Sequence, residues 1–254
     1  MRILSKSALA AIVVLCAAVG LARGDFVAAT VEFGLGSELN VMALDSITDK
    51  IYVSNSSNNM VTILNGLNDS TISIEGAVHP AAIALNPVTN KIFVANGFSG
   101  SITIIDGLTD SAITLSMKSN LSSIGAIAVN PVTNKIYVAN YLGNWVAILN
   151  GATDSTTIIS VESGQLGFAI NQVTNKIYVA SAGSDTVTIV DGKTNSTSAV
   201  IAGTGSTALA ANQVTNMIYV ANTASNTVTS INGATTATAP LMLDQGLRRS
   251  HSIR

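Results

Sequence analysis

Between residues 41 and 243, hydrophobic side chains occur in short runs in which apolar positions alternate with polar or small ones. A period of two is typical of a β-strand, whereas helical repeats place apolar residues three and four positions apart. Clusters of Gly, Asn, Asp, Ser and Thr, which are common turn residues, separate the runs. This pattern predicts an all-β protein of short strands and tight turns.

One segment recurs five times along the chain. Its equivalent positions Asp45, Asn86, Asn130, Asn171 and Asn212 are 41, 44, 41 and 41 residues apart. A period near 40 with short strands is that of one four-stranded blade of a β-propeller. The copies are ALDSITDKIYVSN (Ala43–Asn55), ALNPVTNKIFVAN (Ala84–Asn96), AVNPVTNKIYVAN (Ala128–Asn140), AINQVTNKIYVAS (Ala169–Ser181) and AANQVTNMIYVAN (Ala210–Asn222).

We therefore expect about five antiparallel blades, in a domain that covers residues 25–243. The repeat units are residues 41–75, 81–117, 124–162, 166–202 and 207–243. In the second unit, the expected strands are Ala81–Asn86, Lys91–Asn96, Ser101–Asp106 and Ala112–Met117. An alanine near the start of each copy fits a first strand that lies close to the crowded propeller axis.

The expected turns use residues that tolerate a left-handed backbone. The first turn of each unit ends on Asp49, Asn90, Asn134, Asn175 or Asn216. The second hairpin has Asn59, Gly100, Asn144, Asp185 or Asn226 before its third strand. The third turn carries an Asn-Gly or Asp-Gly pair, beginning with Asn65-Gly66, which is a strong hairpin signal.

These units resemble the YVTN β-propeller repeat family, whose signature follows an Asn-Pro-x-Thr-Asn-Lys turn. The signature stands here as YVSN, FVAN, YVAN, YVAS and YVAN, over about Val41 to Gly233. The resemblance implies a secreted, periplasmic or cell-surface propeller and no fixed catalytic residue. Members of the family commonly have seven blades, so an incomplete ring of a larger propeller is an alternative to a ring of five.

Two segments could supply the fourth strand of the last blade. One is Phe26–Phe33 (FVAATVEF), which would close the ring, and the other is Thr236–Leu243. We favour closure, because an open ring exposes faces that are prone to aggregate. The basic segment 244–254 lies outside the repeat pattern and is expected to be an irregular tail.

The first 24 residues have the pattern of a secretory signal peptide. A basic start, Arg2 and Lys6, precedes the uncharged run Ala8–Ala22, with cleavage expected after Ala22 or Gly24. The alternative is an uncleaved anchor, although the run is shorter than the roughly 18 to 20 apolar residues of a membrane span. Cleavage would remove Cys16, the only cysteine, and leave no span and no disulfide.

Composition excludes several functional classes. Only 10% of the residues are charged, which argues against a disordered chain or a coiled coil. The first 24 residues hold three of the 12 basic residues and none of the 14 acidic ones, so the remainder carries a net charge of −5. A nucleic-acid partner is therefore not expected.

Motifs for common catalytic chemistry are absent from the sequence. It contains no HExxH, CxxC pair, Walker loop, GxSxG or EF-hand loop, and only two histidines, His79 and His251. We therefore expect no catalytic residue, no metal site and no cofactor. The carboxylates of Asp106 and Asp191 are expected to cap turns.

Variation among the units indicates where a binding site would lie. The second hairpins and the linkers between blades share one face and differ most from unit to unit. We therefore expect a ligand on this face, whether a protein, a glycan or a small molecule. The candidate contacts are His79, Phe98, Lys118, Tyr141 and Trp145, with burial between blades as the other interpretation of Trp145.

Two functions are consistent with the sequence. The first is a secreted binding module that presents varied loops on a rigid disc. The second is an extracytoplasmic enzyme, either a metal-assisted hydrolase or lyase or the partner domain of a redox enzyme. That enzyme would need Asp, Glu or Asn side chains to converge on a cation at the axial mouth, or His79 to lie near a carboxylate. The Asn and Asp side chains at positions 45, 86, 130, 171 and 212 are the candidates for such a ring, although we expect them to start turns.

Overall fold

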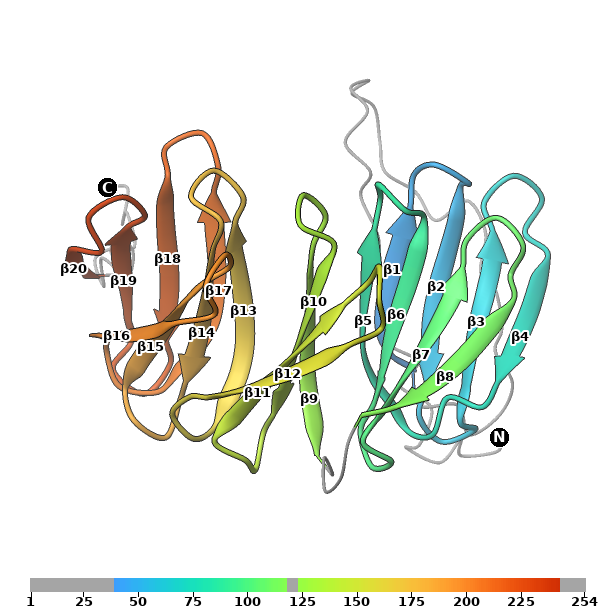
Figure 1. Ribbon diagram of the computed structural model, residues 1–254, viewed down its shortest axis with the longest axis horizontal. Helices are drawn as coiled ribbons and strands as arrows, with labels where there is room; N and C mark the ends of the chain where they lie inside the picture. Colours follow the sequence, from blue (N-terminus) through green and yellow to red (C-terminus); the bar gives the residue numbers. More distant parts are fainter. Residues whose placement is uncertain (1–38, 118–122, 243–254) are drawn as a thin grey trace, which may run out of the picture.

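The computed structural model describes residues 39–117 and 123–242, and these residues form twenty strands and no helix. The strands make five separate antiparallel sheets of four, each with its strands in chain order (Figure 1). Each sheet is one repeat unit, so the predicted blade is confirmed. The expected signal peptide (1–24), the segment Phe26–Phe33, Lys118 and the tail 244–254 lie outside the described residues.

The blades have nearly identical strand lengths. Blade 1 contains β1 (Leu39–Asp45), β2 (Lys50–Asn55), β3 (Met60–Asn65) and β4 (Thr71–Glu75). Blade 2 contains β5 (Pro80–Asn86), β6 (Lys91–Asn96), β7 (Ser101–Asp106) and β8 (Ala112–Ser116). Blade 3 contains β9 (Ile124–Asn130), β10 (Lys135–Asn140), β11 (Trp145–Asn150) and β12 (Thr156–Ser160). Blade 4 contains β13 (Gln165–Asn171), β14 (Lys176–Ser181), β15 (Thr186–Asp191) and β16 (Thr197–Ile201). Blade 5 contains β17 (Ser206–Asn212), β18 (Met217–Asn222), β19 (Thr227–Asn232) and β20 (Thr238–Met242).

The last blade has a fourth strand of its own. Strand β20 pairs antiparallel with β19, and it lies within the second of the two predicted segments, Thr236–Leu243. Blade 5 therefore completes its sheet without the segment Phe26–Phe33.

The core lies between successive blades. In β14, Tyr178 is fully buried and packs against Ile218, Val220 and Ile231 of blade 5. Tyr52, Phe93 and Tyr137 occupy the same place in blades 1 to 3, and each is also 0% exposed. Both faces of an inner blade are thus covered by neighbouring sheets, which explains a largely aliphatic chain without a helix layer.

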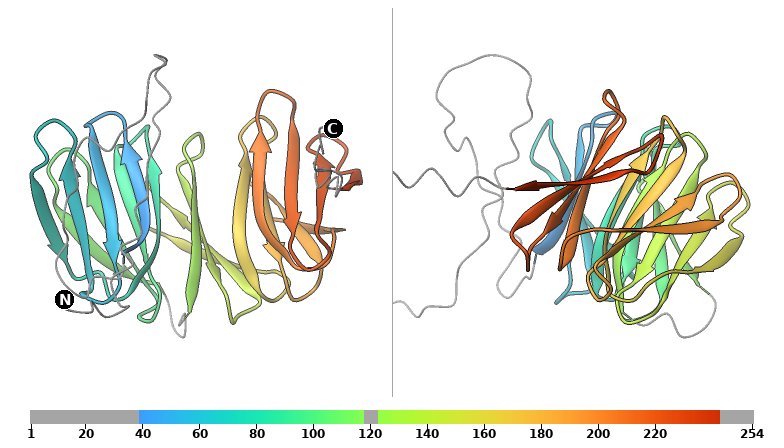
Figure 2. Two further views of the ribbon diagram at one scale, coloured as in Figure 1. Left: turned by 180° about the vertical axis from the view of Figure 1, so that it is seen from behind. Right: turned by 90° about the vertical axis from the view of Figure 1, so that its left-hand side faces the viewer.

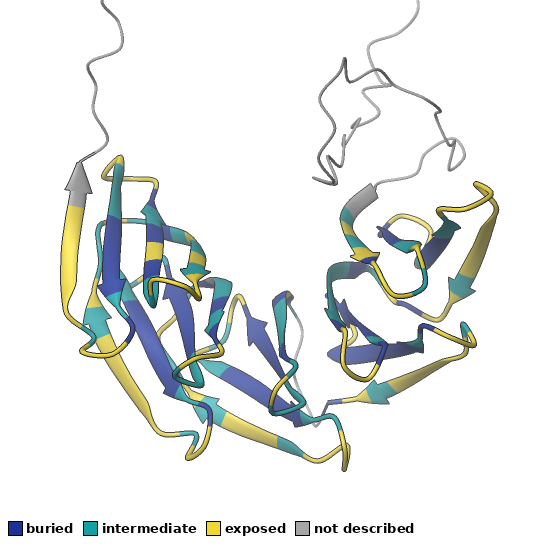
Figure 3. Cartoon of the chain, turned by 90° about the horizontal axis from the view of Figure 1, so that it is seen from above, coloured by how far each residue is buried: buried dark blue, intermediate teal, exposed yellow. Residues whose placement is uncertain are grey.

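The blades follow one another in an open arc (Figures 2 and 3). The first strands pack together in the order β1, β5, β9, β13 and β17, so they line the inner side of the arc. Among the described residues, blade 5 does not pack on blade 1, so these residues form an open arc and not the closed ring that the sequence favours. Accordingly, Tyr219 of blade 5 is 37% exposed, whereas its four equivalents are fully buried.

The turns confirm the left-handed residue predicted for the first turn and correct part of the predictions for the second and third turns. The first turn ends in a left-handed residue in all five blades, with φ between 50° and 55°. The second hairpin has a left-handed residue before its third strand in four blades, but Asn144 in blade 3 is not left-handed. That loop is held instead by the Asn140 side chain, whose Oδ1 accepts from the backbone N of Leu142 and Gly143 at 3.0 Å each.

The third turn is a hairpin, but the Asn-Gly pair does not supply its left-handed residue. In blade 1, that residue is Asp69, with φ of 57°, whose N–H donates to the Asn65 carbonyl. Gly66 is required for a different reason, because a Cβ there would lie 2.8 Å from the backbone oxygen of Asp49. The glycine therefore allows the third turn to contact the first turn, an arrangement that depends on tertiary structure.

Candidate functional site

The second hairpins and the linkers between blades form one face of the arc, which we call the loop face. The hairpin of blade 2 is bound by the linkers on both sides of it. In blade 2, Gly97 N donates to His79 O at 2.9 Å, and Met117 N donates to Gly100 O at 3.1 Å. These backbone hydrogen bonds fix the loops that differ most among the repeats.

His79 and Phe98 form a stacked pair on the loop face. Their ring centroids are 3.9 Å apart, with an interplanar angle of 29°. His79 has a left-handed backbone, φ 51°, and its N–H donates to Oδ1 of Asn59 in blade 1 at 2.8 Å. Since blade 1 and blade 2 both hold His79, it forms a fixed base under Phe98, which is 67% exposed.

The neighbouring loop brings Tyr141 to the same area. Ser123 N donates to Gly97 O at 2.7 Å, and Tyr141 N donates to Ser123 O at 2.9 Å. This chain of hydrogen bonds joins the loops of Phe98 and Tyr141. Tyr141 is 47% exposed, and Leu142 beside it is 74% exposed. Sequence reasoning did not select Leu142, although a large apolar residue in a variable loop could have identified it.

Trp145 lies at the beginning of β11 and is partly buried. It packs against the apolar cluster between blades 2 and 3, and its Nε1 would lie 2.5 Å from a Cβ on Gly143. This placement agrees with burial between blades. Of the five candidates, His79 and Phe98 touch, Tyr141 is connected to them through the backbone, Trp145 packs between blades, and Lys118 lies outside the described residues.

The axial Asn side chains are engaged in the scaffold. Asn86 Oδ1 accepts from Val88 N at 3.0 Å, and its Nδ2 donates to Oδ1 of Asn134 in the next blade at 2.8 Å. The same inter-blade bond joins Asn130 to Asn175 and Asn171 to Asn216. These residues therefore cap their own turns and tie adjacent blades together.

Hydrogen bonding and burial shift the pKa values of several ionisable groups. Backbone N–H groups of Thr109 and Leu108 bind Asp106 and lower the pKa of its carboxyl group, as expected for a turn cap. Asp191 has a lowered pKa for the same reason. Burial raises the pKa of Tyr137 to about 12, and the negative charge of Asp191 adds to this shift. Burial also raises the pKa of Tyr178.

Two searches of the described residues gave negative results. No group of three or more His, Cys, Asp or Glu side chains is arranged to hold a metal ion in residues 39–117 and 123–242. Within the same ranges, no helix has the length and hydropathy needed to cross a membrane.

Comparison with solved structures shows the fold. A chain from the crystal structure of a nidogen/laminin complex superposes with a TM-score of 0.62 and 13% sequence identity, covering 81% of this chain and 80% of that one. A streptogramin B lyase superposes with a TM-score of 0.68 and 11% identity, covering 81% of this chain and 68% of that one. Both are β-propeller proteins, so the chain has a β-propeller fold. No protein-family profile and no curated protein matches the sequence.

Proposed function

We propose that this chain is an extracytoplasmic binding module of the YVTN type that captures a protein partner on its loop face. The contact surface in this proposal consists of Phe98, Tyr141 and Leu142, with His79 as the support of Phe98. Secretion or export to the periplasm or cell surface is part of the proposal and follows from the pattern of residues 1–24.

The observation that carries the proposal is the stacked pair of His79 and Phe98. Phe98 is 67% exposed, and the part of the ring that faces water does not stabilise the fold, because only apolar surface removed from water does so. Here the ring is nevertheless held at 3.9 Å on a histidine that two blades fix in position. Rigid exposed aromatic side chains are typical of the contacts that dominate binding energy in protein interfaces, because little conformational entropy is lost on binding.

The neighbouring loop supports a protein partner. Tyr141 and Leu142 are exposed apolar side chains on the blade 3 loop, which backbone hydrogen bonds join to the loop of Phe98 in blade 2. Exposed apolar side chains on two adjacent loops suit contact with a macromolecular surface. One similar fold comes from a nidogen/laminin complex, which is consistent with a propeller that binds a protein.

The proposal is tested by comparing two exposed side chains on opposite faces of blade 2. Phe98 lies on the loop face, and Leu108, which is 72% exposed, lies in the third turn on the other face. The purified full chain and its Phe98→Ser and Leu108→Ser variants are immobilised and exposed to the extracytoplasmic proteins of the source cells. Bound proteins are then quantified by mass spectrometry.

We expect one partner to bind the wild type and Leu108→Ser equally and Phe98→Ser at least about tenfold more weakly. Tyr141→Ser should weaken the same partner. Equal retention by all variants would refute the loop face as the binding surface.

The streptogramin B lyase shows that this fold also occurs in an enzyme. Fold similarity alone does not transfer an activity. The axial residues that such a site would use are engaged in turn and inter-blade hydrogen bonds in this chain, as at Asn86 and Asn130. The binding module is therefore the function that we propose.

A further inference from the structure

Charged residues are distributed unequally between the two faces of the arc. The first and third turns form the face opposite the loop face, and we call it the turn face. The lysines of the described residues all lie on the turn face: Lys50, Lys91, Lys135, Lys176 and Lys193. The loop face holds Glu75, Glu162 and Asp185, and no lysine or arginine among the described residues. Its fixed charges within residues 39–117 and 123–242 are therefore all negative.

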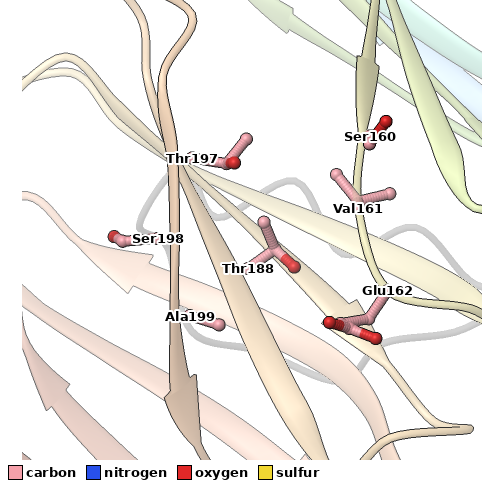
Figure 4. Close-up of a pocket in the computed structure, with 7 residues that line it drawn as sticks. All are labelled: Ser160, Val161, Glu162, Thr188, Thr197, Ser198 and Ala199. Atoms are coloured by element: carbon pink, nitrogen blue, oxygen red, sulfur yellow. The ribbon is translucent and has the colours of Figure 1, made fainter.

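Two of these carboxylates are free to interact with a partner. On the turn face, Asp110 forms an ion pair with Lys50 at 2.7 Å. Glu75 and Glu162 are exposed, and neither side chain has a hydrogen bond or ion pair with another described residue. Figure 4 shows the Glu162 carboxylate projecting from the linker after β12 into the space between blades 3 and 4.

The third carboxylate and the linker between blades 2 and 3 change this picture little. Asp185 Oδ1 accepts a hydrogen bond from Gly205 N at 3.0 Å, so this side chain holds a neighbouring linker. Lys118 lies outside the described residues. Even when Lys118 is counted, the second hairpins and linkers contain three acidic residues and one basic residue.

Glu75 is fixed on the blade 1 side of the exposed apolar residues. It stands in the same connection as His79, four residues before it. Between them, Ala77 is fully buried in the cluster between blades 1 and 2, while Val78 is 43% exposed. The buried alanine and the bond from His79 N to Asn59 hold this connection beside the stacked pair.

Glu162 is fixed on the opposite side, next to the hairpin of Tyr141 and Leu142. The side chain of Gln165 is fully buried and joins the two segments. Its Nε2 donates to Gly143 O at 2.9 Å and also to Glu162 O. The exposed apolar residues are thus flanked by an unpaired carboxylate on each side.

We propose that the partner captured on the loop face presents an apolar contact flanked by lysine or arginine residues. This inference rests on the proposed function and specifies the chemistry of its partner. In protein interfaces, a central apolar contact is typically surrounded by a polar rim, and the charges of the two rims are complementary. A partner with an acidic rim would place like charges opposite Glu75 and Glu162, with no described lysine or arginine on the loop face to offset them.

The charges should act mainly on the rate of association. Exposed rim charges steer the encounter of two proteins and are screened by salt over a distance of about 8 to 10 Å. The apolar contacts at Phe98 and Tyr141 should instead determine the rate of dissociation. The two contributions can therefore be measured separately.

The test measures peptide binding to the immobilised full chain by surface plasmon resonance. Three synthetic peptides share a Leu-Ser-Trp-Ser-Leu core and carry two lysines, two glutamates or two serines on each side of it. At low ionic strength, we expect the lysine peptide to bind at least about tenfold more tightly than the glutamate peptide, with the serine peptide between them. Salt at 0.5 M should remove most of this difference.

Two double variants locate the charges that matter. Glu75→Gln with Glu162→Gln should weaken the lysine peptide about fivefold, mainly through slower association. Asp69→Asn with Asp154→Asn is the matched control, because it removes the same charge from exposed third turns of the turn face. Asn195 occupies this left-handed position in blade 4, so the control variant should fold, and it should bind as the wild type does.

The outcomes separate this inference from the proposed function. Equal weakening by the two double variants would mean that net charge alone attracts the peptide, and this result would overturn the inference. Equal affinity for the lysine and glutamate peptides, or no binding of any peptide, would also overturn it. The proposed function would survive each of these results if a captured protein partner still depended on Phe98.

Discussion

Two tyrosines at equivalent positions test whether the arc is open at blade 5. Tyr178 is 0% exposed between blades 4 and 5, while Tyr219 is 37% exposed on the outer face of blade 5. The residue opposite Tyr178 is Ile189, but the residue opposite Tyr219 is Ser230. Both tyrosines are changed to alanine in otherwise identical chains.

The expected costs follow from burial. Removing the ring of Tyr178 leaves a cavity against Ile218, Val220 and Ile231, and such changes cost about 3 to 5 kcal/mol. Its hydroxyl has no hydrogen-bond partner among the described residues, so no hydrogen bond is lost. Part of Tyr219 remains in water and no closed cavity forms, so Tyr219→Ala should cost only about 1 to 2 kcal/mol.

Urea denaturation followed by circular dichroism measures both free energies of unfolding. We expect Tyr178→Ala to lower the free energy of unfolding by about 2 kcal/mol more than Tyr219→Ala does. If the denaturation curve shows a second transition, we assign it to blade 5 unfolding separately from the other blades. Equal losses for the two variants would mean that the outer face of blade 5 is covered, which would refute the open arc.

Three further changes test individual features of the scaffold. Burial raises the pKa of Tyr137 to about 12 from about 10, so the stabilisation by its neutral hydroxyl is complete below pH 10 and is lost as the pH rises to 12. Tyr137→Phe should therefore reduce the loss of stability at alkaline pH, measured by circular dichroism, and an unchanged pH titration would contradict this prediction. Lys50 Nζ lies 2.7 Å from Oδ1 of Asp110, so Lys50→Met should lower the free energy of unfolding by about 1 kcal/mol in urea denaturation, and by less at high salt. An equal loss at low and high salt would argue against a stabilising ion pair. Gly66→Ala places a methyl group 2.8 Å from a backbone oxygen and should lower the melting temperature by several degrees, whereas an unchanged melting temperature would show that the two turns do not touch.

The strands could be predicted almost to the residue because local rules determine them. Alternation and turn residues placed Lys91–Asn96 and Ser101–Asp106 with the bounds that the structure has. Each repeat also provided an independent copy of the same pattern. The curvature of the arc could not be obtained in this way, because the angle between neighbouring blades depends on how their side chains pack.

The candidate site was only partly accessible from the sequence. Variation among the loops pointed to Phe98 and Tyr141, but the stacking of His79 depends on Asn59 in another blade and on a left-handed backbone. No local pattern encodes such a contact between blades. Ser181 carried a visible signal, since it interrupts a series of asparagines, but only the structure shows that its hydroxyl is buried without a hydrogen-bond partner among the described residues.

The most direct test of the central claim is site-specific photo-cross-linking. p-Benzoylphenylalanine is introduced in place of Phe98 in one chain and in place of Leu108 in another, and both are irradiated in the presence of the extracytoplasmic proteins of the source cells. The loop-face hypothesis predicts a discrete cross-linked species from position 98 and none from position 108. Cross-linking from position 108 alone, or from neither position, would contradict it.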